Sequence, residues 1–142
     1  MASPFESGVL NLRLYELRQE PVLREARAWF LRDFNPSTLA EVFETVRGER
    51  NSSFRMVLGY WDMAASLVAT GAIDAPAFLA AHNEIYGTFS KIQPFLDDMR
   101  TASSEPDFCK HIEAVLMTDP NATATMTRRR EAIRAAAVSR TG

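Results

Sequence analysis

The strongest constraint on the fold of this chain comes from two long apolar segments, residues 53–70 and 75–100, which are separated by a short turn at Gly71. A single face of the second segment, at about 100° per residue, carries Phe78, His82, Ile85, Phe89, Ile92, Leu96 and Met99. A short connection between helices makes them antiparallel neighbours. The sequence therefore predicts a central antiparallel helical hairpin.

The first of these two segments is apolar around most of its circumference. Trp61 belongs to one apolar face of the helical wheel. The opposite face carries Met56, Tyr60 and Met63. Because a helix with so little polar surface is buried on several sides, we expect residues 53–70 to form the central helix of the core.

Proline, glycine and capping patterns divide the rest of the chain into further helices. Thr38 with Glu41 and Ser104 with Asp107 have the spacing of helix N-terminal caps. The expected additional helices cover about residues 8–19, 21–34, 39–47, 105–118 and 121–139.

These elements predict an all-α fold with a single domain over residues 1–142. We expect a bundle of five to seven helices around the hairpin, wrapped by the second helix and by residues 105–118. Residues 1–7 and the end of 119–142 carry few large apolar groups to dock them, so we expect both ends to be loose.

Composition and charge restrict the classes of function. A net charge of −2 gives no general attraction to nucleic acid or to an anionic membrane. The longest charge-free apolar stretch, Met63 to Ile73, is too short to span a bilayer. The single cysteine, Cys109, favours a reducing compartment, and the first residues lack a secretory pattern. Since arginine also greatly outnumbers lysine, as in many GC-rich bacterial genomes, we expect a bacterial, cytoplasmic protein.

An acid, Asp62, stands beside a tryptophan on the narrow polar strip of the first apolar segment. It has no cation three or four residues away on its own helix. Three interpretations remain open: a solvated carboxylate, a carboxylate paired with a donor on a neighbouring helix, or a chemical group. Since an unpaired buried carboxylate is costly, a buried Asp62 needs a donor, for which Arg27 and Arg32 are candidates.

The residues that most often carry catalysis or bind metal are few. The Glu-x-x-His pairs of di-iron bundles are absent, because Leu79 and Phe108 precede the two histidines by three residues. Cys109 and His111 point about 200° apart on a helix and cannot bind one ion together. We therefore expect no catalytic residue, no metal and no cofactor.

A basic cluster, Arg128 to Arg130, lies near the end of the chain. Such a cluster can contact nucleic acid, remain a solvated face, or pair with acids such as Asp97 and Asp98. No aromatic residue interleaves the arginines and no helix-turn-helix is recognisable. We therefore do not expect nucleic-acid binding.

The segment from Leu58 to Arg100 reads as an apolar residue followed by Tyr-Trp-acid, an apolar helix, Gly-x-Ile-Asp, and a second helix ending in Lys-Ile-x-Pro-Phe. This arrangement resembles a family of small all-helical bacterial proteins of unknown function. The resemblance implies an all-α fold and a bacterial source, and it assigns no catalytic residue.

Two functions fit these patterns. The first is a non-enzymatic interaction or scaffolding module, a homodimer or the partner of another protein, since Met56, Tyr60 and Met63 face away from the main apolar stripe and need covering. The alternative is a small-ligand sensor or accessory domain. Its ligand pocket would lie between the hairpin helices, at Trp61, Asp62, His82 and Tyr86.

Overall fold

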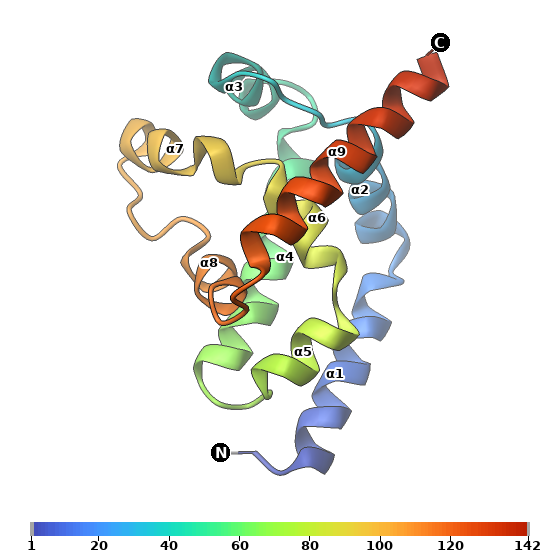
Figure 1. Ribbon diagram of the computed structural model, residues 1–142, viewed down its shortest axis with the longest axis vertical. Coiled ribbons are helices and arrows are strands. Elements are labelled where there is room, and N and C mark those ends of the chain that lie inside the picture. Colours follow the sequence, from blue (N-terminus) through green and yellow to red (C-terminus); the bar gives the residue numbers. More distant parts are fainter. Residues whose placement is uncertain (1, 142) are drawn as a thin grey trace.

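The computed structural model describes residues 2–141, and in that range it contains helices and no strand (Figure 1). The elements are α1 (Pro4–Arg18), α2 (Pro21–Arg32), α3 (Leu39–Arg47), α4 (Asn51–Ala69), α5 (Ala75–Ala81), α6 (Glu84–Ser90), the 3-10 turn η1 (Gln93–Phe95), α7 (Leu96–Ser103), α8 (Lys110–Leu116) and α9 (Ala122–Thr141). The all-α prediction is confirmed, although there are more helices than the five to seven expected.

The extra helices arise because residues 75–100 are not one helix. Helix α5 ends at Ala81, and His82 leaves the helical conformation at φ −127° and ψ 48°. A second break follows Ser90, where α6 ends, and the turn η1 beyond it contains Pro94, which was expected to bend the chain. The seven residues of the sequence stripe are nevertheless all buried. The periodicity therefore identified the core residues correctly but not the continuity of the backbone.

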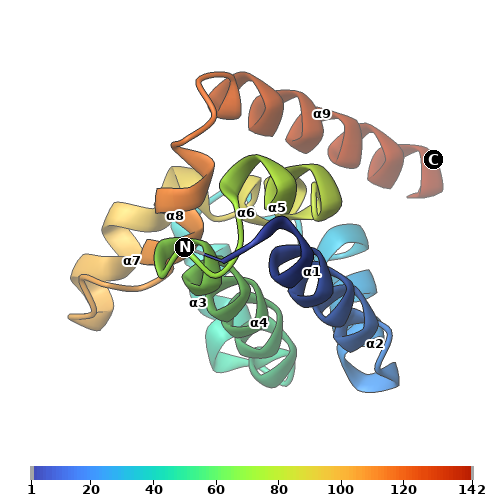
Figure 2. The same ribbon diagram turned by 90° about the horizontal axis from the view of Figure 1, so that it is seen from below.

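The predicted central hairpin is wrong as an architecture. Helix α4 packs mainly against α2 and α8, the two segments that were expected to wrap the hairpin. The most buried element is the short helix α6, which lies between α9 on one side and the α2 and α8 helices on the other. Viewed from below, α9 forms an outer layer, α5 and α6 lie beneath it, and α1, α2 and α4 form the opposite layer (Figure 2).

Helix α4 is amphipathic and is not buried on all sides. Its inner face carries Phe54, Val57, Leu58, Trp61, Ala64 and Ala65. On the other face, Met56 and Met63 are 40% and 43% exposed. Tyr60 is half-buried because α1 covers it, and its hydroxyl donates to the Leu14 carbonyl. The expectation of a helix surrounded by neighbours fails because α1 shields only the Tyr60 part of this face.

Both ends of the chain contain ordered helix. Helix α1 begins at Pro4, where Ser3 and Glu6 form a reciprocal capping box with bonds of 3.1 and 3.0 Å. Helix α9 continues to Thr141 and lies across α6 (Figure 1). Residues 4–7 belong to α1 and residues 122–141 form α9, so the helix expected over about 121–139 is present, and Met1 and Gly142 lie outside the described residues.

Candidate functional site

The carboxylate of Asp62 caps a helix in another part of the chain. Its Oδ1 atom accepts hydrogen bonds from the backbone N–H groups of His111 and Ile112, at 3.0 and 3.1 Å. These groups belong to the first turn of α8, which has no cap from its own preceding residue, Cys109. Unsatisfied N–H groups and the helix dipole make this end of a helix a good place for a negative charge.

This geometry decides between the three interpretations of Asp62. The acid is paired, but its donors are backbone groups and not the expected Arg27 or Arg32. The expected cap of Ser104 with Asp107 is also wrong, since Ser104 ends α7 and α8 begins only at Lys110. Asp62 supplies the capping interaction that the local sequence before α8 lacks.

A buried lysine, Lys91, caps the C-terminal end of α2, as Asp62 caps the N-terminal end of α8. The Lys91 ammonium donates to the carbonyls of Phe30, Leu31 and Phe34, each at 2.7 Å, and to Asn35 Oδ1 at 2.9 Å. These oxygens lie at and just beyond the C-terminal end of α2. Burial lowers the pKa of Lys91 to about 7, while its oxygen acceptors favour the charged form. With so many acceptors around it, Lys91 is a structural cap.

The basic residues of α9 follow the same pattern. Arg130 donates to the Ser90 carbonyl at 2.8 Å, at the end of α6, and Arg129 reaches the Asn83 carbonyl at 3.4 Å. Arg134 and Arg140 donate to the carbonyls of Pro36 and Arg32 at 2.8 and 2.9 Å. Of the alternatives for this cluster, pairing with Asp97 or Asp98 does not occur among the described residues, and Arg128 is exposed to solvent. The arginines dock α9 onto backbone carbonyls.

A partly buried ion cluster joins α1, α2 and α6. Glu84 accepts two hydrogen bonds of 2.8 Å from Arg27, and Arg18 approaches the same carboxylate at 3.8 Å. The bond to Glu84 raises the pKa of Arg27. Tyr60 lies near these charges, and burial raises its pKa to about 12. No sequence spacing predicts this cluster, because Arg27 and Glu84 are 57 residues apart.

Of the four predicted pocket residues, the structure brings together Trp61 and His82. Their ring centroids are 6.0 Å apart, and the His82 ring also lies 5.1 Å from Phe78. Trp61 is fully buried and His82 is 1% exposed. Burial and the charge of Arg18 lower the pKa of His82 to about 4, while the neighbouring Asn11 backbone acts in the opposite direction. The imidazole is therefore neutral at pH 7.

The other two residues lie at separate places. Tyr86 donates to the Asp119 carboxylate at 2.7 Å and lines a cavity that includes Leu79 and Pro120. Burial and this bond raise the pKa of Tyr86 to about 12. Asp62 borders a different cavity, together with Phe108 and Cys109. Trp61 and His82 therefore form one pair, and Asp62 and Tyr86 have partners of their own.

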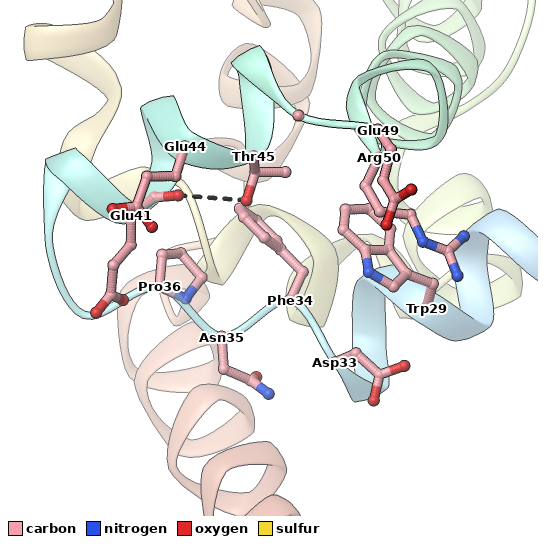
Figure 3. A pocket seen from close by; sticks show the side chains of 11 residues that line it. Trp29, Asp33, Phe34, Asn35, Pro36, Glu41, Glu44, Thr45, Glu49 and Arg50 are labelled. Carbon is pink, nitrogen blue, oxygen red and sulfur yellow. Dashed lines mark hydrogen bonds between the residues drawn. The ribbon is translucent and has the colours of Figure 1, made fainter.

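A cleft of about 400 Å³ opens between α2, α3 and the start of α4 (Figure 3). Trp29 and Phe34 provide its aromatic wall, and Glu41, Glu44 and Glu49 lie around it. This chemistry suits a cationic side chain. The Arg50 guanidinium of this chain already lies 5.3 Å from the Trp29 ring centroid.

A larger cavity, about 520 Å³, lies between α1 and the connection from α4 to α5. Val68 and Ile73 are among its mainly apolar lining residues, and Gly8 and Asn11 contribute from α1. Gly71 has φ +81° in this connection, a conformation that glycine adopts without strain. The sequence reasoning missed this cavity because it placed the pocket between two helices that do not form a hairpin.

The remaining reactive groups are not activated. Burial raises the pKa of the Cys109 thiol to about 12, so the thiol stays protonated. Within residues 2–141, no three His, Cys, Asp or Glu side chains gather as a metal site. No described helix is both long and apolar enough to cross a membrane.

Together, the fold and these contacts define an all-α domain whose buried polar side chains bind the ends of other helices. Residues 5–118 match the family model described as a domain of unknown function, DUF4760, and the chain belongs to that family. Neither a curated protein nor a solved structure matches it. The family match ends before α9, so the matched region contains α1 to α8.

Proposed function

We propose that this protein is a non-enzymatic interaction module that self-associates through the outward face of α1. The observation that carries this proposal is an apolar stripe on that face. Phe5, Val9 and Leu12 follow a spacing of four and three residues and are 79%, 49% and 67% exposed. Large apolar side chains that share one exposed face are typical of a protein interaction surface.

The partner that fits this face best is a second copy of the chain. Arg13 and Glu16 lie next to the stripe, are both exposed, and form an ion pair at 3.6 Å. A face with both signs of charge is complementary to itself, as a twofold dimer requires. The net charge of −2 also gives little repulsion between two copies.

The neighbouring surface can extend this interface. A stable interface covers about 800 Å² on each partner, which is more than one short stripe provides. Helix α4 borders α1 through the Tyr60–Leu14 contact and exposes Met56 and Met63 on the same side as Tyr60. Methionine adapts its shape to a partner surface, which suits these positions.

The use of the polar groups supports a non-enzymatic role. Asp62 and Lys91 hold helix ends, the Cys109 thiol stays protonated, and the His82 ring is buried and neutral. A general base or nucleophile needs access to a substrate and a pKa matched to its task. None of these four groups combines the two properties.

The oligomeric state in solution tests this proposal. We expect light scattering after size-exclusion chromatography to give twice the mass of the chain, and Leu12→Glu with Val9→Glu to give the monomer mass. Val138→Glu is the matched control, because Val138 is 69% exposed on α9, away from the stripe. A wild-type monomer at high concentration, or equal dissociation by the control, would refute the proposal.

We also infer a bacterial, cytoplasmic setting. The excess of arginine over lysine supports a bacterial source, and the single buried thiol of Cys109 supports a reducing compartment. Fractionation of cells that produce the tagged full-length protein tests the location, and recovery in the periplasm or the membrane would contradict it.

A further inference from the structure

His82 and three other side chains, Asn11, Arg18 and Trp61, carry buried polar atoms for which residues 2–141 supply no hydrogen-bond partner. These atoms are Asn11 Oδ1, Arg18 Nε, Trp61 Nε1 and both ring nitrogens of His82. Native proteins leave few buried polar groups unpaired, because each unpaired group loses its hydration without compensation. Such a concentration of unpaired groups at one place indicates a polar binding partner.

The four side chains lie close together. Arg18 places its guanidinium 5.5 Å from the Trp61 ring centroid, and that ring lies 6.0 Å from His82. The Asn11 backbone acts on the His82 ring as a weak hydrogen-bond partner that raises its pKa, although the geometry does not make a full hydrogen bond to either ring nitrogen. The unpaired groups therefore lie in one region of the interior between α1, α4 and the end of α5.

The cavity of about 520 Å³ borders this region at Asn11, whereas Arg18, Trp61 and His82 are outside its lining. Asn11 belongs both to the lining of the cavity and to the group of unpaired side chains. The volume lies in the usual range for small-molecule sites, and side chains such as Val68 and Ile73 make its wall mainly apolar. Asp74 caps Ala77 with its carboxylate at 3.0 Å, so that charge is already bound.

We propose that this cavity binds a small, uncharged, mainly apolar molecule whose one polar group donates a hydrogen bond to Asn11 Oδ1, the buried and unpaired acceptor in the cavity lining. The apolar wall accepts the body of the molecule. Asn11 Oδ1 is an acceptor without a donor, so the O–H of a hydroxyl or the N–H of an amide group fits. This site is separate from the outward face of α1 and does not depend on self-association.

The test uses 1-octanol as the probe and the full-length protein. We expect saturable NMR shifts of the Asn11 side-chain amide and of the backbone amides that line the cavity. Gly8→Leu should weaken binding at least tenfold, because a Cβ at Gly8 meets open space and the longer side chain can fill the cavity. Ala75→Leu is a second filling variant from α5.

Gly59→Leu is the matched control, since Gly59 lies in α4, also has open space at its Cβ, and is outside this cavity. Its affinity for 1-octanol should equal that of the wild type. Asn11→Leu should weaken binding about fivefold if the polar group is recognised. The proposal is overturned if wild-type protein shows no saturable shift, if both filling variants bind as the control does, or if Asn11→Leu binds unchanged.

Discussion

Replacing Asp62 by alanine tests whether a side chain on α4 stabilises α8. The variant removes the acceptor of the His111 and Ile112 N–H groups, which bond to it at 3.0 and 3.1 Å. Loss of an N-terminal cap costs about 0.5–2 kcal/mol, and hydrogen bonds to charged groups are worth about 1.5–3 kcal/mol. Because Asp62 is half-buried, we expect the free energy of unfolding to fall by about 2 kcal/mol.

The conservative variant gives a graded result. Asp62→Asn keeps an oxygen acceptor but removes the charge, and since charge-assisted bonds are roughly twice as strong as neutral ones, the loss should be about 1 kcal/mol. The measurements are urea unfolding at pH 7 and thermal unfolding. A chain of this size changes its Tm by roughly 3–4 °C per kcal/mol, so Asp62→Ala should unfold about 7 °C lower.

A control and a local readout complete the test. Glu131→Ala removes an acid from exposed helix, where the described residues give it no bond to lose. Hydrogen exchange should accelerate in α8 of Asp62→Ala more than in α6. If Asp62→Ala and Glu131→Ala have the same stability, or if exchange in α8 does not change, the proposed cap is wrong.

Three further predictions follow from other contacts. The pKa of His82 is lowered from 6.5 to about 4, so between these pH values the unfolded chain binds one more proton than the folded chain. The free energy of unfolding therefore falls as the pH decreases from 6.5, by about 3 kcal/mol at pH 4. The free energy of unfolding of His82→Phe, measured by urea titration at pH 7 and pH 4, should lack this decrease. An equal decrease in the variant and the wild type would contradict the prediction. Lys91→Met leaves the Phe30, Leu31 and Phe34 carbonyls without their donor and should lower the free energy of chemical unfolding by about 3 kcal/mol. The control Lys110→Met, at an exposed site, should change it by no more than about 0.5 kcal/mol. A Cβ at Gly87 would lie 3.5 Å from Ile133 Cδ1, so Gly87→Leu should displace α9 and speed hydrogen exchange across residues 122–141; unchanged exchange there would show that the two helices do not pack this closely.

The sequence predicts burial better than it predicts helix boundaries. The stripe from Phe78 to Met99 names seven core residues, and all seven are buried, because apolar periodicity reports which side chains must leave water. The same periodicity gives no sign that the helix ends before His82. Nothing in the local pattern shows that the backbone leaves the helical conformation to turn this ring toward Trp61.

The candidate site could be predicted only in part. Trp61 and His82 are in contact because both occupy apolar faces that pack in the core, but the pocket expected at these residues stays a prediction. Asp62 and Lys91 could not be assigned, because their partners are backbone groups. Those groups become available only where a helix begins or ends, and the ends of α2 and α8 depend on the tertiary fold. The cavity beside Asn11 depends in the same way on how α1 lies against the α4–α5 connection.

The capping by Asp62 has a consequence for how related sequences can diverge. An N–H group is present at positions 111 and 112 whatever side chain stands there, with proline as the exception. Substitutions at these two positions can therefore accumulate without a compensating change at position 62. Covariation between aligned sequences would not detect this contact, even though the packing of α8 on α4 depends on it.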